Sequence, residues 1–191
     1  MVTKQEVVTP TRFASGASYS EFTARIEKNV DLFASNYDNT KVSSDLEKRL
    51  KAVAARPNGP KKLLVLGEDW CPDVFRGLPV LARIAEAGGI EFKAFFRDQN
   101  LDIMNAYLNK GEFQSIPTAL FYTGDLDLIL VWHERPDKAN EEMPALRSLY
   151  ANRTREEAMP DVQEFYKGPI WAGWRDATVE EIAQKLESAT A

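Results

Sequence analysis

The chain contains a single cysteine, Cys71, and its surroundings favour chemistry at the sulfur. The apolar run at residues 63–66 precedes it, ends at Gly67, and predicts a strand buried on both faces. Pro72 follows at once, and proline is well tolerated at the first position of a helix. We therefore expect Cys71 to cap a helix, where unpaired backbone N–H groups and the helix dipole stabilise a thiolate. A thiolate is the nucleophile that attacks disulfide bonds.

Charged residues near the cysteine act in opposite directions. Glu68, Asp69 and Asp73 disfavour a thiolate, whereas Arg76 would favour one. A lone cysteine is also often a small buried hydrophobic residue without a chemical role. The strand–loop–helix setting favours a partly exposed and reactive Cys71 over that alternative.

Hydrophobic patterning predicts the elements that must position this cysteine. The helix that starts at Cys71 should end at the Gly88-Gly89 pair, with a kink near Pro79. Asn100 is a suitable cap for a short helix. Apolar runs predict three further strands, at residues 90–96, 117–122 and 126–132.

Two short motifs resemble a known family. The run Trp70-Cys71-Pro72-Asp73-Val74 after a hydrophobic strand is similar to the Trp-Cys-x-x-Cys active site of thioredoxin-fold proteins, and Ser115-Ile116-Pro117-Thr118 is similar to their cis-proline loop. The order of the expected helices and strands between residues 61 and 136 also matches. The resemblance implies an α/β fold, a thioredoxin-like mixed sheet covered by helices.

The resemblance also implies roles for individual residues. Cys71 would be the reactive residue and Pro117 a cis-proline that shapes the adjacent groove, with Trp70 as a wall of that groove. The resolving cysteine of the motif is absent, because Val74 stands in its place. The expected substrate-binding residues are Trp70, Pro72, Asp73, Val74, Ile116 and Pro117.

The flanks extend this core within one domain, residues 1–191. Residues 1–60 are expected to form an N-terminal helical extension, and residues 137–191 helices that pack on the core of residues 61–136. Residues 1–17 should be a loose lead-in, and one helix should run from a cap at Ser18 to Phe33.

The C-terminal flank has its own helix signals. We expect residues 168–174, with two tryptophans, to form a loop. Helix caps are predicted at Ser44, Thr154 and Thr178, each followed by glutamate three residues later.

His133 is the only histidine, and we predict where the last two strands place it. A hairpin turn centred near Gly124 and Asp125 would set Pro117 opposite Trp132 and His133 opposite Ile116. His133 would then emerge at the same end of the sheet as Cys71 and could supply a cationic partner for its thiolate. The alternative is a strand-end residue satisfied by backbone or water.

Composition limits the partners. The net charge of −5 and the absence of a basic stripe argue against nucleic acid. No apolar run suits a membrane span, and one cysteine excludes an intramolecular disulfide, so we expect a cytoplasmic protein. One cysteine and one histidine fall short of a structural zinc set, and no metal or cofactor is predicted.

Two functions remain open. The first is thiol redox chemistry through Cys71 alone, in which the protein forms mixed disulfides with protein or small-molecule thiols that an external thiol later releases. The second is a redox-inactive binding module that uses the groove around Trp70, Cys71 and Pro117.

Overall fold

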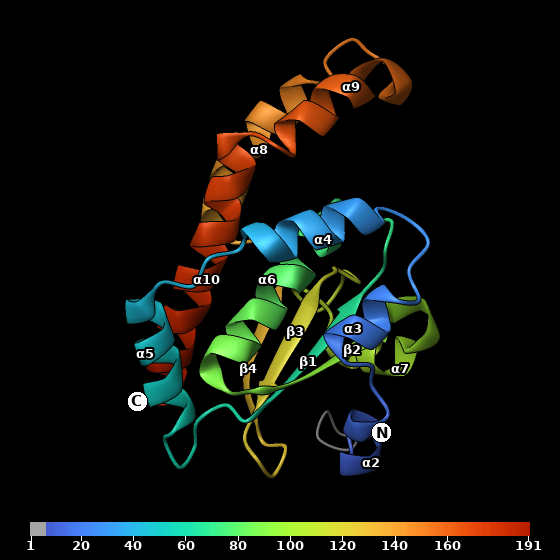
Figure 1. The fold of residues 1–191 in the computed structure, drawn as a ribbon. Helices are drawn as coiled ribbons and strands as arrows, with labels where there is room; N and C mark the ends of the chain where they lie inside the picture. The colour runs from blue at the N-terminus through green and yellow to red at the C-terminus, as the bar shows by residue number, and fades with distance from the viewer. Residues whose placement is uncertain (1–6) are drawn as a thin grey trace.

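A four-stranded mixed sheet lies at the centre of the computed structural model, which describes residues 7–191 (Figure 1). Its strands are β1 (Lys62–Gly67), β2 (Glu91–Phe96), β3 (Thr118–Tyr122) and β4 (Leu128–His133), in the order β2-β1-β3-β4. The β1–β2 pair is parallel, whereas β3 is antiparallel to both β1 and β4. The predicted α/β fold with a mixed sheet is therefore confirmed.

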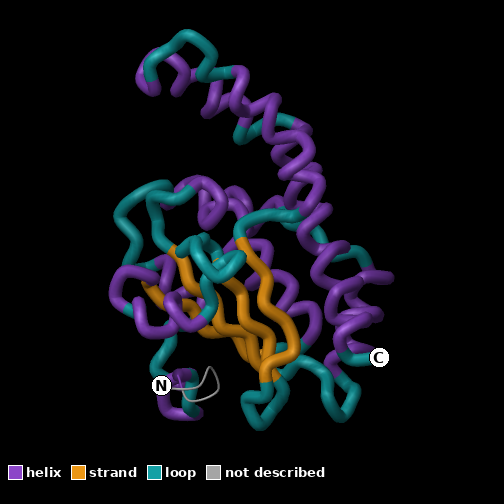
Figure 2. Tube along the Cα trace, turned by 180° about the vertical axis from the view of Figure 1, so that it is seen from behind, coloured by secondary structure: helices purple, strands orange, loops and turns teal. Residues whose placement is uncertain are grey.

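Four helices pack together against the sheet. They are α4 (Val30–Asn39), α5 (Ser44–Ala54), α6 (Pro72–Gly88) and α10 (Pro169–Ala189), and α6 contacts the other three. Seen from behind, the strands lie in front of these helices (Figure 2). Burial from both faces explains the apolar run of β1, in which the side chains of residues 63–66 are fully buried.

Shorter elements line the β2 side of the sheet. They are α2 (Pro10–Ala14), α3 (Tyr19–Thr23), the 3₁₀ turn η1 (Arg97–Gln99) and α7 (Leu101–Ala106). Ala17 forms an isolated antiparallel bridge with Ala94 of β2, and Arg12 pairs with Asp102 at 2.9 Å. The N-terminal segment is thus attached to the sheet edge.

The N-terminal flank departs from the sequence prediction in two places. Phe13 of α2 is buried, so residues 7–17 are not a loose lead-in, and residues 1–6 lie outside the described part. The predicted capping box of Ser18 and Glu21 is present, but its helix ends at Thr23 instead of continuing to Phe33. Asn29 has a left-handed backbone (φ 57°) and separates α3 from α4.

The C-terminal flank contains α8 (Asp137–Ser148), α9 (Arg155–Phe165) and α10. Helices α8 and α9 and the first part of α10 extend beyond the sheet (Figure 1). Thr154 caps α9 with Glu157 as predicted. The predicted loop at residues 168–174 is wrong, because Gly168 caps α10 and Pro169 occupies its first turn, and for the same reason Thr178 lies inside this helix and not at a cap.

The hairpin between β3 and β4 has a different register from the one predicted. Thr118 lies opposite His133, and the Glu134 N–H donates to the Pro117 carbonyl at 2.8 Å. The pairing is thus displaced by two residues, because β4 begins only at Leu128. Leu126 takes a left-handed conformation (φ 69°), and the ladder shifts next to Tyr122.

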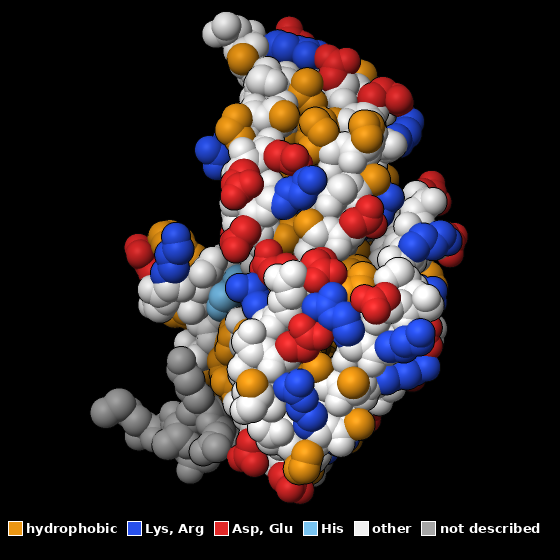
Figure 3. All heavy atoms as spheres, turned by 90° about the vertical axis from the view of Figure 1, so that its left-hand side faces the viewer, with side chains coloured by type: hydrophobic (Ala, Val, Ile, Leu, Met, Phe, Trp, Pro, Cys, Tyr) orange, Lys and Arg blue, Asp and Glu red, His pale blue; other side chains and the backbone are white. Residues whose placement is uncertain are grey.

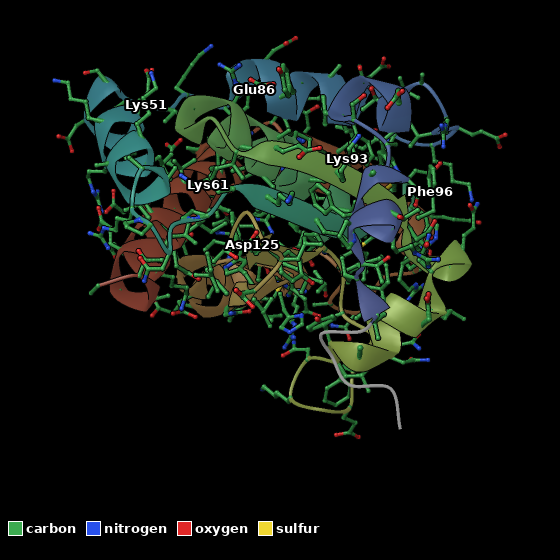
Figure 4. All side chains as sticks on the ribbon, turned by 90° about the horizontal axis from the view of Figure 1, so that it is seen from below. Lys51, Lys61, Glu86, Lys93, Phe96 and Asp125 are labelled. Atoms are coloured by element: carbon green, nitrogen blue, oxygen red, sulfur yellow. The ribbon has the colours of Figure 1, made fainter. Side chains whose placement is uncertain are left out.

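The turn of this hairpin closes one end of the sheet. The Lys61 N–H donates to the Tyr122 carbonyl at 2.8 Å, and the Lys62 ammonium donates to the Gly124 carbonyl. Figure 4 views the molecule from this side, with Lys61 and Asp125 labelled. Cys71 follows the C-terminal end of β1, so it lies at the end of the sheet opposite this turn.

Within residues 7–191, no helix combines the length and apolar character needed to cross a membrane.

Candidate functional site

Cys71 lies where strand β1 passes into helix α6. It is the N-cap residue of α6, and Pro72 occupies the first turn, as the sequence predicts. The side chain is partly buried, and its Sγ lies 3.7 Å from the carbonyl oxygen of Ile116, to which the thiol donates a hydrogen bond. The cysteine loop and the 115–118 loop, distant in sequence, therefore meet at the sulfur.

The surroundings hold the thiol in its protonated form. Burial, and after it the negative charge of Asp73, raise the pKa of Cys71 from 9.0 to about 11. The backbone N–H groups of Val74 and Asp73 and the charge of Arg135 lower this pKa, but less. At pH 7 only about one thiol in ten thousand is ionised, because each pH unit below the pKa lowers the thiolate fraction tenfold.

Asp73 forms ion pairs with two arginines, Arg76 and Arg135. Its Oδ1 accepts a hydrogen bond from Arg76 at 2.8 Å, and its Oδ2 accepts one from Arg135 at 2.6 Å. Both guanidiniums are therefore paired with Asp73, and of the two only Arg135 is among the causes that lower the pKa of Cys71. Arg76 was expected to favour ionisation of Cys71, but its ion pair with Asp73 offsets that effect.

Arg76 itself is fully buried, between α6 and α10. Its guanidinium carbon lies 5.4 Å from the ring centre of Trp171 and 5.7 Å from that of Trp174. Its Nη2 also donates to the Glu134 carbonyl at 3.3 Å. The two tryptophans thus contribute to the environment of the cysteine, because they enclose an arginine that is paired with Asp73.

Val74 is the residue at which the resemblance to the Trp-Cys-x-x-Cys motif would place a second cysteine. Its side chain is completely buried, and a Cβ on Gly67 would come within 2.7 Å of Val74 Cγ1. Gly67 is thus required by the close approach of α6 to β1. The valine fills this contact and presents no group that could resolve a mixed disulfide.

The 115–118 loop packs closely on α6. The peptide bond between Ile116 and Pro117 is cis. A Cβ on Gly77 would lie 3.1 Å from Pro117 Cγ, so the proline ring rests against the helix backbone. This contact fixes the distance between the loop and the helix that carries Cys71.

Exposed apolar side chains flank these loops. Trp70 is 45% exposed and Phe113 is 52% exposed. Arg97 links the two segments, because its guanidinium carbon lies 5.5 Å from the Trp70 ring centre and its Nη1 donates to the carbonyl of Gln114, the residue after Phe113, at 3.4 Å. Ile116 and Pro117, expected to bind substrate, are themselves buried beside Cys71. We call Trp70, Cys71 and Phe113, together with the buried Ile116 and Pro117, the Cys71 surface.

His133 has a different partner from the one considered above. Its Nδ1 lies 2.9 Å from the hydroxyl of Thr118, the residue opposite it in the ladder. Burial lowers the pKa of His133, although Glu134 acts in the other direction. His133 lines a cleft with residues of β4 and α10, whereas the hydrogen bond of the Cys71 thiol goes to Ile116.

The sequence singled out most residues of this site but not their pairing. The structure brings Trp70, Cys71, Asp73 and the Ile116–Pro117 pair to one region. Arg135 was not identified from the sequence as a partner of Asp73. Its position just before Pro136, at the predicted end of the sheet, was the only indication that it could lie near the site. In the described part of the chain, no group of three or more histidine, cysteine or acidic residues could hold a metal ion.

Comparisons with known proteins agree with this geometry. A family model described as thioredoxin matches residues 16–154. The chain is similar to a crystal structure of a protein of unknown function from Pseudomonas aeruginosa, with 20% identity, a TM-score of 0.70 and 99% of each chain covered. It is also similar to an HIV epitope scaffold, with 19% identity and a TM-score of 0.65 over 95% of this chain and 99% of the scaffold. No curated protein matches the chain.

Proposed function

Because the chain belongs to the thioredoxin family, we propose that it keeps the family's site as a binding surface and holds the cysteine as a neutral thiol. The observation that carries this proposal is the environment of Cys71. Its thiol is partly buried, donates to a carbonyl, and lies beside the carboxylate of Asp73. A protonated thiol is a poor nucleophile, so attack on a disulfide at neutral pH would be slow.

The proposed ligand is a polypeptide segment with apolar side chains. Trp70 stacks near Arg97, Arg97 bonds to the Gln114 carbonyl next to Phe113, and both rings are exposed; large exposed apolar groups commonly mark interaction sites. Such rings bury much area at little entropic cost when a partner covers them. The Cys71 thiol would then contribute a weak hydrogen-bond donor and not a covalent bond.

A second candidate is monothiol redox chemistry, in which a mixed disulfide formed at Cys71 is released by an external thiol. One observation favours it. The backbone N–H groups of Asp73 and Val74, at the start of α6, lower the pKa of Cys71. This effect is smaller than that of burial and Asp73, so binding remains the better-supported function.

Binding to an unfolded polypeptide with its thiols blocked tests the proposal, because such a probe cannot form mixed disulfides. Reduced and carboxymethylated α-lactalbumin is a suitable probe. We expect Cys71→Ser to bind it as the wild type does, and the double variant Trp70→Ala/Phe113→Ala to bind at least tenfold more weakly, as roughly 1.4 kcal/mol implies. Leu128→Ala is the matched control, because Leu128 is an exposed apolar residue at the far end of β4.

Alkylation distinguishes the two candidates. The rate of Cys71 reaction with iodoacetamide should rise with a midpoint near pH 11. A midpoint near pH 7, or equal binding by the double variant and the wild type, would refute the binding proposal.

A further inference from the structure

A second site lies at the end of β4, on a face that the Cys71 surface does not include. A cleft of about 530 Å³ opens there between β4, α10 and the loop after α7. We call it the His133 cleft. Its lining includes Lys110, His133, Arg135, Asp137, Glu181 and Lys185. Figure 3 looks onto this face, where the histidine side chain (pale blue) lies beside basic side chains (blue) in a hollow of the surface.

Hydrogen bonding fixes which nitrogen of His133 carries the proton. The buried Thr118 hydroxyl donates its one hydrogen to the Ser115 carbonyl at 2.7 Å, because a carbonyl can only accept. The 2.9 Å contact between this hydroxyl and His133 Nδ1 must therefore be donated by the imidazole. In the neutral ring, Nε2 is then an unprotonated acceptor.

The acceptor is available to a ligand. Within residues 7–191, no hydrogen bond or ion pair engages Nε2, and the ring lines the cleft. Burial lowers the pKa of His133, so the ring is neutral near pH 7. A neutral histidine with its other nitrogen anchored is a typical oriented acceptor for an O–H or N–H group.

Cations in the cleft provide the second recognition element. Lys110 makes no ion pair in the described part of the chain, and the Lys185 ammonium is 3.9 Å from Glu181. The cleft also has three acidic residues, Glu134, Asp137 and Glu181, of which Glu134 lies 3.7 Å from Arg135. Glu181 already accepts from Trp132 at 2.9 Å and from the Asp137 N–H at 2.7 Å.

We propose that the His133 cleft binds a small carboxylate that also carries an O–H or N–H donor, such as a 2-hydroxy or 2-amino acid. The donor bonds to His133 Nε2, and the carboxylate lies toward Lys110 and Lys185. Asp137 lines the same cleft and suits the ammonium of an amino acid. This site is independent of the binding function proposed for the Cys71 surface.

The single histidine makes the test direct, because ¹⁵N labelling of histidine gives one pair of ring signals. At pH 7.5 we expect the pattern of a ring protonated at Nδ1 and unprotonated at Nε2. Lactate and glycine are the probes, and at least one should shift the Nε2 signal with saturation. Acetate, which lacks the donor, and ethylene glycol, which lacks the carboxylate, are the controls and should not saturate.

Two variants locate the ligand. Lys185→Gln should weaken binding about threefold, the value of one exposed ion pair. His133→Phe, followed through the ligand signals, should weaken it about tenfold through loss of the acceptor. A ring protonated at Nε2, an equal response to all four probes, no saturation with either lactate or glycine, or unchanged affinity in His133→Phe would each overturn the proposal.

Discussion

Replacing Asp73 by asparagine should make Cys71 more acidic. The amide keeps the shape and an acceptor oxygen for Arg76, which lies 2.8 Å from the carboxylate, but removes the charge. Asp73 is the second cause of the raised pKa of Cys71, after burial. Its loss also leaves the positive charges of Arg76 and Arg135 uncompensated near the sulfur. We expect the pKa of Cys71 to fall from about 11 by roughly one pH unit, which makes the thiolate about tenfold more abundant at pH 8.

The assay is the rate of iodoacetamide alkylation between pH 7 and pH 11, followed by mass spectrometry. Asp69→Asn is the matched control, because it removes a carboxylate from the same loop. Asp69 accepts from the backbone N–H groups of Glu27 and Lys28 at 2.9 and 3.0 Å, and it is not among the main causes of the raised pKa of Cys71. An unchanged midpoint in Asp73→Asn, or an equal shift in Asp69→Asn, would refute the reasoning.

Stability needs a separate check, because Arg76 is fully buried and would lose its ionic partner. Breaking a buried ion pair typically costs about 3–5 kcal/mol. Should Asp73→Asn not fold, Arg135→Gln tests the same idea with the opposite sign. Arg135 is only partly buried, and its loss removes a positive charge that lowers the pKa of Cys71, so this pKa should rise further.

Three further predictions concern the core and the thiol. Val74→Cys should supply a second thiol one helical turn from Cys71, so that at alkaline pH, where Cys71 ionises, only the prereduced variant reduces one equivalent of a disulfide substrate without an added thiol; the same stoichiometric reduction by the wild type would contradict this. Because the pKa of Cys71 is raised in the folded state, its contribution to stability is fully present below about pH 9 and is lost as the pH rises through 11. Between pH 8 and pH 11 the free energy of unfolding, measured with urea, should therefore fall by about 2 kcal/mol more for the wild type than for Cys71→Ser, and an equal fall for both proteins would exclude the effect. Asn36→Leu should cost roughly 1–3 kcal/mol, because the buried Asn36 Oδ1 accepts from Trp171 at 3.2 Å and from Arg175 at 3.1 Å, and an unchanged unfolding midpoint would show that these bonds do not matter.

The core of the fold could be predicted because its signals are local. The apolar run before Cys71, the Pro72 start of α6 and the Gly89 end are each set by residues close in sequence. The register of β4 could not be predicted, because it depends on the conformation of Leu126 in the turn and on an irregularity near Tyr122.

The candidate site likewise combines features that local sequence predicts with features that depend on the tertiary structure. Its position followed from the Trp70-Cys71-Pro72 run and from Pro117, but its electrostatics depend on residues brought together by the fold. Arg135 and Asp73 are far apart in sequence yet lie 2.6 Å apart. Asp73 forms ion pairs with both Arg76 and Arg135. These pairs depend on tertiary packing, so no local sequence pattern predicts them.

The contact between Gly77 and Pro117 gives one backbone position control over the width of the Cys71 surface. Alanine normally stabilises the interior of a helix relative to glycine by about 1 kcal/mol. At position 77 an added methyl group would lie 3.1 Å from the proline ring, so either the 115–118 loop or helix α6 must shift by a few tenths of an ångström. The same shift would change the distance between the Ile116 carbonyl and the sulfur of Cys71, the N-cap residue of α6. A side chain at position 77 therefore acts as a spacer against Pro117, and a graded series of side chains there would change the width of the Cys71 surface without replacing any of its residues.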